Sequence, residues 1–416
     1  MTAALCAPAA WGATVDCGHL LDVKAGRWRE NVRLTVESGH FAAVAPAADG
    51  GADVDLRALW CLPGLIDMHV HLTDQTKDQA HSFRDTVQRN LWDQAYESTG
   101  FAERTLLAGF TTVRDLGAEG ALNVSLKHAI EQGWVRGPRM LTAGIAIGST
   151  GGHADPTDGY KHEFAKAGGP ADGVIDSVDD ARKAVRARYK EGADLIKVMV
   201  TGGVLDLSAS GDNAQLTEEE IRAIVATAKD YGFRVAVHAH GAEGMKRAIR
   251  AGVDSVEHGT YMDDEAMRLF RQKGTWYVPT LSAGRFCVEK AKLPDYFPAI
   301  IRPKALAIGP LMAGTFARAW KAGVKVAFGT DTGVSPHGEN AKEFAYLAEA
   351  GMPAIEAIRA ATLNAAELLR AGEKLGSVEP GYAADLIAVD GDALADVTRL
   401  QHVAFVMKAG SVVKTP

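Results

Sequence analysis

The sequence has few cysteines, no excess of basic residues and no long apolar run. Lysine and arginine number 45 against 52 aspartates and glutamates, which makes the formal net charge −7. Such a surface repels phosphate backbones, so we expect no nucleic-acid partner. The four cysteines are scattered without a CxxC pair, and we expect neither a disulfide framework nor a structural zinc knuckle. No apolar run approaches the ~18–20 residues that cross a bilayer, so we also expect no membrane partner.

The N-terminus lacks the basic start of a secretory signal. Residues 1–13 are small and apolar, as in the apolar part of such a signal, but they contain no lysine or arginine. This segment is either a frayed tail or the remnant of a truncated export signal. We expect a bacterial-type soluble protein, with cytoplasm and periplasm both open as its compartment.

Apolar residues are plentiful and regularly placed. Hydrophobic residues make up 47% and charged residues 23% of the 416 positions, which excludes intrinsic disorder. After Cys61, eight short runs rich in Val, Ile and Leu are typical of strands buried on both faces. They cover residues 64–71, 110–115, 139–143, 194–200, 234–240, 255–259, 276–281 and 325–329.

Helix signals separate these runs. Thr217 and Glu220 form a capping box before apolar residues at helical spacing, and Gly232 follows the end of that helix. Further helices are expected over residues 177–190, 242–251, 263–272, 342–350 and 353–370. The repeated alternation predicts an α/β fold, a (β/α)8 TIM barrel. An open doubly wound sheet would need a GxGxxG motif after its first strand, and the sequence has none there.

Both chain ends have the pattern of β-structure. Strands are expected over residues 15–23, 32–38 and 41–45, and again over 385–389, 403–408 and 411–414. We therefore predict a small β-sandwich domain built from both termini, residues 1–62 and 376–416. The barrel would occupy residues 63–375.

Five of the 13 histidines lie at or beside the ends of predicted strands. His69 and His71 are two residues apart, so both imidazoles face the same side of their strand. His238, His240 and His258 end the fifth and sixth strands, and the strand ends of a barrel surround one cavity. Imidazoles gathered there make a poor apolar core but a good site for a divalent ion. One of His238 and His240 is then a ligand and the other a substrate contact.

Lys197 and Asp331 add a second kind of ligand. Lys197 lies in ADLIKVMV, a strand otherwise suited to burial, and desolvation lowers the pKa of a buried amine toward neutrality. A neutral amine can take up carbon dioxide to form a carbamate, an anion with two ligand oxygens. A salt bridge from Lys197 to a carboxylate such as Asp115 is the alternative, and the nearby histidines favour the carbamate. Asp331 follows the last strand in FGTDTG, where a carboxylate can bind metal and hold a proton.

The order of these motifs resembles that of the amidohydrolase superfamily. The pattern is HxH after strand one, Lys after strand four, His after strands five and six, and Asp after strand eight. LPGLIDMHVHL, GTDTG and GYAADLIAVDGD fit it as well. KVMVTGG, VAVHAHG and VEHGT are similar to the metal-dependent Xaa-Pro and Xaa-Arg dipeptidases, a carboxypeptidase-like branch that bacterial ochratoxin A amidases resemble.

The resemblance implies two divalent metal ions, with zinc as the default. It selects His238 rather than His240 as the ligand from strand five and leaves His240 beside the substrate. It also gives Asp331 the task of moving a proton from the attacking hydroxide to the leaving amine. The implied ligands are His69, His71 and Asp331 for one ion and His238 and His258 for the other, with carbamylated Lys197 and a hydroxide bridging the pair.

The substrate side rests on fewer residues. His153, in the loop STGGHADP, is a candidate donor to a substrate carbonyl or carboxylate, and a solvent-facing loop histidine is the alternative. Gly202, Gly203 and Val204 can offer backbone N–H groups to a free carboxylate, because small residues allow close approach.

The predicted activity is the hydrolysis of an amide bond that releases a C-terminal amino acid. The substrate would be a small molecule, namely a dipeptide, an N-acyl amino acid or an ochratoxin-like amide, and the resemblance implies a homo-oligomer. An alternative enzyme is a mononuclear cyclic amidase or deaminase similar to imidazolonepropionase, against which Lys197 argues. A non-enzymatic alternative is a metal-free scaffold protein on the same barrel, against which the complete ligand set argues.

Overall fold

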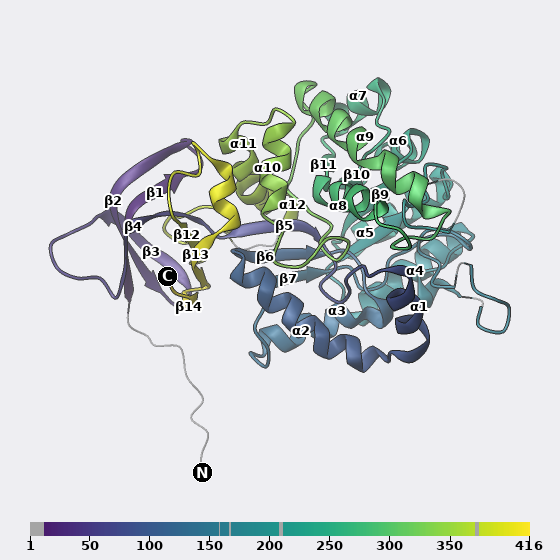
Figure 1. Ribbon diagram of the computed structural model, residues 1–416, viewed down its shortest axis with the longest axis horizontal. Coiled ribbons are helices and arrows are strands. Elements are labelled where there is room, and N and C mark those ends of the chain that lie inside the picture. The colour runs from purple at the N-terminus through teal and green to yellow at the C-terminus, as the bar shows by residue number, and fades with distance from the viewer. Residues whose placement is uncertain (1–11, 158, 166–167, 208–210, 371–373) are drawn as a thin grey trace, which may run out of the picture.

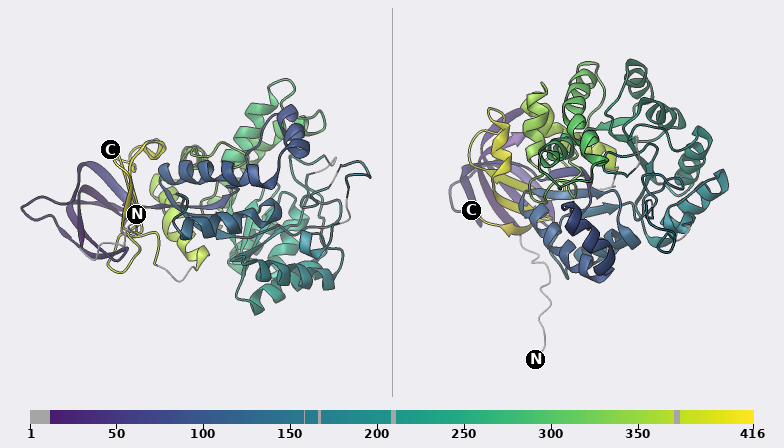
Figure 2. Two further views of the ribbon diagram at one scale, coloured as in Figure 1. Left: turned by 90° about the horizontal axis from the view of Figure 1, so that it is seen from below. Right: turned by 45° about the vertical axis from the view of Figure 1, so that its right-hand side comes forward.

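The computed structural model describes residues 12–157, 159–165, 168–207, 211–370 and 374–416. Figure 1 shows a sheet region, in which purple and yellow strands from the two ends of the chain lie together, beside an α/β region. Figure 2 shows the same two parts from two further sides. Within the described ranges, no helix is both long enough and apolar enough to cross a bilayer. Most of the proposed export-signal remnant, residues 1–11, lies outside the described residues.

Seven strands from the two chain ends pair into one sheet. Its order is β14-β13-β12-β4-β1-β2-β3. The strands are β1 (Ala13–Asp22), β2 (Arg27–Glu37), β3 (His40–Pro46), β4 (Val54–Pro63), β12 (Leu386–Val389), β13 (Val403–Lys408) and β14 (Ser411–Lys414). Leu34, Phe41 and Phe405 belong to its apolar core. Our prediction missed β4, and the described strands form a single sheet, whereas the predicted β-sandwich requires two.

A disulfide joins two neighbouring strands of this sheet. Cys17 on β1 and Cys61 on β4 are bonded, with Cα atoms 6.1 Å apart and a sequence separation of 44. The expectation of no disulfide framework, drawn from scattered spacing, missed this bond. The reason is that β1 and β4 pair in parallel, so tertiary pairing rather than sequence spacing brings the sulfur atoms together. Cys287 is a free, buried cysteine.

The α/β region contains seven strands that pair in parallel in two ladders. The first ladder is β5 (Leu65–Val70), β6 (Phe110–Asp115) and β7 (Arg139–Thr142), and the second is β8 (Leu195–Met199), β9 (Arg234–Ala239), β10 (Ser255–His258) and β11 (Trp276–Val278). These are the first seven of the eight predicted strands, and β5, β6, β10 and β11 are buried along their whole length. The predicted α/β class is confirmed.

The eighth predicted strand, residues 325–329, differs from the prediction. In the described chain it makes one isolated bridge, Val326 to Tyr277 of β11, and Thr332 makes another to Val70 of β5. This segment therefore lies between the open edges of the two ladders without forming a ladder itself. The backbone leaves the extended conformation at Asp331, where φ is +57°, two residues beyond the predicted strand.

Helices surround these strands (Figure 1). They are α1 (Gln79–Gln88), α2 (Leu91–Leu107), α3 (Leu122–Glu131), α4 (Val178–Glu191), α5 (Glu218–Asp230), α6 (Ala242–Ala251), α7 (Asp264–Lys273), α8 (Leu281–Ala291), α9 (Ile301–Lys321), α10 (Lys342–Glu349), α11 (Ala354–Arg359) and α12 (Ala365–Leu369). The capping box of Thr217 and Glu220 precedes α5 as predicted. The helix predicted over residues 353–370 is interrupted by a π-helical turn at Ala360–Asn364. The main apolar core includes strand residues such as Val198 and helix residues such as Ile224.

Candidate metal centre

The predicted ligands lie near the carboxyl ends of strands from both ladders. His69 is on β5 and Lys197 on β8, and each is 1% exposed. His238 on β9 and His258 on β10 are each 4% exposed. Parallel strands bring these ends to the same edge, so residues far apart in the sequence meet in one buried place.

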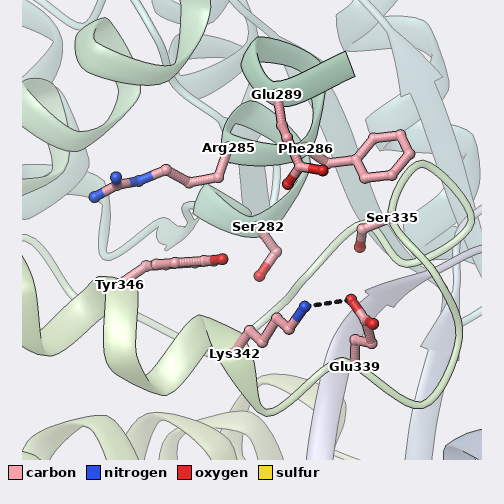
Figure 3. Close-up of a pocket in the computed structure, with 8 residues that line it drawn as sticks. All are labelled: Ser282, Arg285, Phe286, Glu289, Ser335, Glu339, Lys342 and Tyr346. Carbon is pink, nitrogen blue, oxygen red and sulfur yellow. Dashed lines mark hydrogen bonds and ion pairs between the residues drawn. The ribbon is translucent and has the colours of Figure 1, made fainter. Parts of the chain in front are cut away.

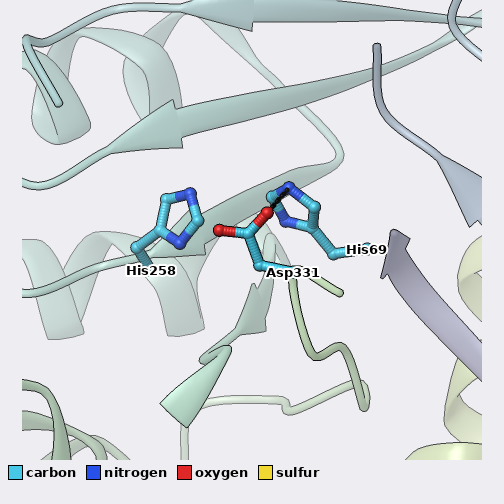
Figure 4. A group of neighbouring side chains, drawn as sticks. All are labelled: His69, His258 and Asp331. Carbon is cyan, nitrogen blue, oxygen red and sulfur yellow. Dashed lines mark ion pairs between the residues drawn. The ribbon is translucent and has the colours of Figure 1, made fainter. Parts of the chain in front are cut away.

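The Asp331 carboxylate lies between histidines from the two ladders. Its Oδ1 atom is 3.4 Å from Nε2 of His69 and 3.3 Å from Nε2 of His71. Figure 4 shows the imidazoles of His69 and His258 on either side of this carboxylate. One ligand atom from each of His69, His258 and Asp331 lies within 4.8 Å of the others, a spacing that a shared metal ion can use.

His238 on β9 and His240, the residue that follows β9, complete the cluster. The ring centroid of His258 is 4.6 Å from that of His238 and 5.1 Å from that of His240. The structure therefore brings together all five strand-end histidines named from the sequence. The ring centroid of His69 is also 5.1 Å from that of His258, so His240 and His69 are equally close to His258.

Each imidazole uses one ring nitrogen to contact a protein oxygen or carboxylate, which leaves its other nitrogen for the centre. The contacts are His71 Nδ1 to Gly117 O at 3.0 Å, His238 Nε2 to Gly202 O at 3.0 Å, His240 Nδ1 to Thr260 Oγ1 at 2.7 Å, His258 Nδ1 to Thr280 Oγ1 at 2.7 Å and His69 Nδ1 to Glu257 Oε2 at 3.1 Å. These contacts hold the orientation of each ring.

Lys197 faces the centre rather than the carboxylate considered as its alternative partner. Its Nζ atom lies 3.4 Å from Nε2 of His69. Asp115 instead accepts hydrogen bonds from the backbone N–H of Leu72 at 2.8 Å and from Asn123 Nδ2 at 2.7 Å. Burial lowers the pKa of Lys197 to about 8, so an appreciable fraction of the amine is neutral near physiological pH.

Sequence reasoning missed a buried carboxylate beneath the centre. Glu257 on β10 is inaccessible to solvent, and one of its oxygens contacts His69 Nδ1. The other accepts from Arg114 Nη2 at 2.9 Å and from Ser255 Oγ at 2.5 Å. The sequence did contain a signal for this pair, because Arg114 in VRD and Glu257 in VEH are charged residues within strands that are otherwise suited to burial. Neither strand by itself identifies the other residue as the partner.

A second missed carboxylate, Asp67 on β5, holds the segment that carries Asp331. It accepts from the N–H and Oγ1 of Thr330 at 3.1 and 2.7 Å, and from Asn340 Nδ2 at 2.9 Å. Burial raises the pKa of Asp67 to about 6, against the effect of these donors. The side chain of Asp67 therefore connects the first strand to the turn at Asp331.

The protonation states suit metal ligands. Burial lowers the pKa values of four imidazoles, well below the ordinary value for His69, His238 and His258 and to about 3 for His240. Burial also disfavours the charged form of His71, but Asp331 outweighs it and raises that pKa. Burial works against ionisation of Asp331, yet His69, His71 and Lys197 keep its pKa below the ordinary value. Neutral imidazoles and an ionised carboxylate are the forms that bind divalent ions.

The substrate-side residues are placed less simply. The His153 ring centroid is 4.3 Å from that of His238, and its Nδ1 contacts the Asp206 carboxylate. A Cβ on Gly203 would lie 2.4 Å from Cε1 of His153, so glycine is required for this close approach. The N–H of Gly203 donates to Asp206 Oδ2 at 2.6 Å, and the N–H of Gly202 donates to a backbone oxygen, that of residue 213, at 3.3 Å. Both amides proposed for a substrate carboxylate are thus already engaged, and the role of Val204 stays a prediction.

A separate small pocket of about 40 Å³ lies between α8 and α10 (Figure 3). Ser282, Arg285, Phe286, Glu289, Ser335, Glu339, Lys342 and Tyr346 line it. Lys342 donates to Glu339 Oε2 at 2.6 Å, and Arg285 forms an ion pair with Glu349. The two cationic side chains are therefore neutralised within the protein, and we assign this pocket no part in the chemistry.

Known proteins are similar to this chain in both sequence and structure. A model of the amidohydrolase family matches residues 60–415. An ochratoxinase of Aspergillus niger is 32% identical over 377 residues, which cover 85% of this chain and 76% of that protein. A solved Xaa-Pro dipeptidase with bound methionine in its active site superposes with a TM-score of 0.94 and 46% identity, over 97% of this chain and 100% of that one. A prolidase complexed with N-methylphosphonate-L-proline gives a TM-score of 0.88 at 30% identity, over 98% and 100% of the two chains.

Proposed function

Because this chain belongs to the amidohydrolase family, we propose that it is a dinuclear metal-dependent hydrolase that releases a C-terminal amino acid. Family membership, predicted from the motifs, is confirmed, and it makes the protein a hydrolase of amide bonds in small molecules. The finer proposal names the substrates as dipeptides, N-acyl amino acids or ochratoxin-like amides. It is supported by the similarity to a Xaa-Pro dipeptidase and to an ochratoxinase.

The observation that carries the proposal is the convergence of ligand atoms around Asp331. His69, His258 and Asp331 place one ligand atom each within 4.8 Å of one another, and Lys197 Nζ is 3.4 Å from Nε2 of His69. A buried amine beside a neutral imidazole is an unfavourable structural arrangement. The same amine becomes a suitable bridging ligand once it forms a carbamate.

The carbamate forms from neutral Lys197 and carbon dioxide without any further reactant. The nitrogen lone pair of neutral Lys197 attacks carbon dioxide, the N–C bond forms and one proton leaves for solvent. The resulting anion completes the proposed ligand set of His69, His71 and Asp331 for one ion and His238 and His258 for the other. Zinc is the default ion for these nitrogen and oxygen ligands. When bound, a pair of such ions lowers the pKa of a water molecule and polarises the scissile carbonyl.

The remaining chemistry belongs to the side chains of the chain itself. Asp331 is ionised, so its carboxylate can accept a proton from the attacking water and return it to the leaving amine. His240, held by Thr260, and His153, held by Asp206, stay the candidates to contact the substrate carbonyl or carboxylate. Val204 is the remaining candidate for a backbone contact.

We also propose the finer architecture. The segment 325–332, which bridges β11 and β5, acts as the eighth strand of a barrel. The barrel occupies residues 63–375, and residues 1–62 and 376–416 form the β-domain. A homo-oligomeric assembly remains a prediction.

The mononuclear alternative, similar to imidazolonepropionase, and the metal-free scaffold both conflict with particular residues. A mononuclear centre leaves buried Lys197 without a role. A scaffold without metal leaves four neutral imidazoles buried around a carboxylate at a cost in stability. We therefore retain the dinuclear proposal.

One experiment tests function and metal count together. The purified protein is incubated with Xaa-Pro, Xaa-Arg, Xaa-Phe and N-acyl amino acid substrates, with and without a chelator, and the released amino acid and bound metal are measured. We expect release that requires metal, and two equivalents of metal per chain. One equivalent would support the mononuclear alternative, and none would support the scaffold.

Lys197→Ala separates the carbamate from the rest of the centre. We expect loss of at least one metal equivalent and of most activity, because the bridging ligand is gone. A Lys197→Ala protein with two metal ions and full activity would refute the bridging carbamate. Lys190→Ala, which removes an exposed lysine of α4, is the matched control and should leave both measurements unchanged.

A further inference from the structure

The backbone around His258 is unusual at two positions. His258 has φ +69° and Thr280 has φ +52°, a left-handed conformation that is unfavourable for residues other than glycine and most unfavourable for β-branched ones. Thr280 Oγ1 lies 2.7 Å from His258 Nδ1. Both residues are buried: Thr280 is 0% exposed and His258 is 4% exposed. Contacts with the surrounding protein must therefore stabilise the left-handed conformation of Thr280.

Thr280 is also the N-cap residue of α8, but its side chain does not cap the helix. Threonine is a preferred N-cap because its hydroxyl can accept from the first free amides of the helix. Here the hydroxyl is turned to the imidazole of His258 instead. The first amides of α8 therefore need another acceptor, since buried N–H groups without a partner are costly.

Glu343 of α10 supplies that acceptor from a distant part of the chain. One carboxylate oxygen accepts from the N–H of Leu281 at 2.8 Å, and the other accepts from the N–H and Oγ of Ser282 at 2.6 and 2.7 Å. Glu343 is fully buried, and a carboxylate at a helix N-terminus is stabilised by the helix dipole. Burial raises the pKa of Glu343 to about 8, and these three donors oppose that rise.

We propose that Glu343 is a positioning residue for His258: it caps α8 in place of Thr280 and so leaves the Thr280 hydroxyl to orient the imidazole. Figure 3 shows Ser282 on α8 facing the α10 side chains of Lys342 and Tyr346, which flank Glu343 in the sequence. The inference rests on the proposed function in one respect, because His258 is a ligand only if the centre binds metal.

The test compares Glu343→Gln, Thr280→Val and the double variant in the full-length protein. In Glu343→Gln the amide side chain offers one acceptor atom where the helix amides require two, and Thr280→Val keeps the shape of threonine without its hydroxyl. The control is Glu349→Gln, which removes an exposed charge from the same helix as Glu343. Thr280→Ser is the conservative variant that keeps the hydroxyl. Cobalt(II) is titrated into the metal-depleted protein, and its visible absorption reports stoichiometry and affinity.

We expect each single variant to weaken one of the two cobalt sites roughly 10–100-fold, as losses of groups that orient a metal-bound histidine do. The double variant should bind cobalt with the same affinity as whichever single variant binds it less tightly. The two effects are not additive, because Glu343 acts through Thr280. Glu349→Gln should stay within about twofold of the unmodified protein, and Thr280→Ser should restore most of the affinity that Thr280→Val loses. Additive effects, or a Glu343→Gln protein that unfolds more easily but binds cobalt normally, would overturn the proposal.

A second measurement does not depend on metal. In the metal-depleted protein, the ¹⁵N NMR signal of the His258 ring reports the hydrogen bond of Nδ1 with Thr280. We expect Glu343→Gln to shift this signal toward that of Thr280→Val, and an unchanged signal would refute the positioning role. If the signal shifts but the unmodified protein binds no divalent ion, the positioning of His258 stands and the proposed function fails.

Discussion

Strands β4 and β5 are separated by a single residue, Gly64, yet they bury different kinds of side chain. β4 belongs to the terminal sheet and buries Leu56 and Cys61 among apolar neighbours. β5 belongs to the α/β region and is buried throughout, including Asp67 and His69. Burial of an apolar side chain stabilises a fold, whereas burial of an ionisable one is costly unless it is paired. The terminal sheet therefore contributes stability, whereas the strand ends of the α/β region lose some of it to hold ionisable groups.

The difference has a structural source in the connection itself. A Cβ on Gly64 would lie 2.2 Å from Thr111 Oγ1, so only glycine lets the chain pass directly from the sheet into the α/β region. The chain therefore changes environment within one residue. Substitutions on the two sides should consequently affect different properties, stability on the side of the terminal sheet and chemistry on the side of the α/β region.

The largest effect is expected for Asp331→Asn. The amide cannot take up a proton as the carboxylate does, and general acid–base groups contribute roughly 10²–10⁴-fold to rates. We expect kcat to fall by about that factor while the thermal unfolding midpoint changes little, measured with the best substrate of the panel. Asp396→Asn, which alters an exposed residue before Val397, is the control. An Asp331→Asn protein with normal kcat would remove Asp331 from the proposed chemistry.

Removal of the disulfide should affect stability and not chemistry. The bond between Cys17 and Cys61 closes a separation of 44 residues, and bonds of this kind typically contribute about 2–4 kcal/mol. We expect the double variant Cys17→Ala/Cys61→Ala to lose about that much free energy of unfolding in a denaturant titration. Its metal content and kcat should remain those of the unmodified protein. Reductant should destabilise the unmodified protein and leave the double variant unaffected; an equal response of both would contradict the prediction.

A smaller effect is expected for Glu257→Gln. The amide keeps the size of the side chain but cannot give His69 and Arg114 an anion to share, and loss of such a partner typically costs 10–100-fold in metal affinity or activity. We expect metal affinity to fall by about that factor, measured by competition with a coloured chelator. Glu265→Gln, at an exposed ion pair with Lys246, should leave affinity unchanged. An unaltered affinity in Glu257→Gln would show that His69 is oriented without this carboxylate.

The last expected effect is a pH dependence of stability due to Lys197, which is small over any one pH unit. Its pKa falls from 10.5 when unfolded to about 8 when buried, so between these values the unfolded chain binds more protons than the folded one. The free energy of unfolding should therefore rise with pH from about 8 to 10.5, by at most about 1.4 kcal/mol per pH unit. Denaturant titrations of metal-depleted, carbon dioxide-free protein should show this slope. Lys197→Met should have a smaller slope, to which Lys408, whose pKa is also lowered to about 8 by burial, still contributes. Equal slopes in the two proteins would contradict the burial of a titrating amine.

Much of the fold was predictable because local patterns carry it. Residues 110–115, 403–408 and 411–414 were predicted as strands and match β6, β13 and β14, since a short run rich in β-branched or aromatic residues between turns is typical of a strand. β4 was missed although its second half, ALWCL, is apolar, because that run continues through Pro63 and Gly64 into the next strand without a turn sequence between them. The predicted eighth strand ends in a turn with positive φ at Asp331, and no sequence pattern announced that conformation.

By itself, the sequence determined which groups are proposed to form the centre. His69 and His71 share a face because strand periodicity is local, and Lys197 is noticeable because a charge interrupts an apolar strand. The tertiary structure decided how these groups are held. Glu257 reaches His69 across 188 positions, and Glu343 reaches Ser282 across 61. Such partners are selected by packing between elements, and a hydrogen bond between residues so far apart leaves no trace in the local spacing of the chain.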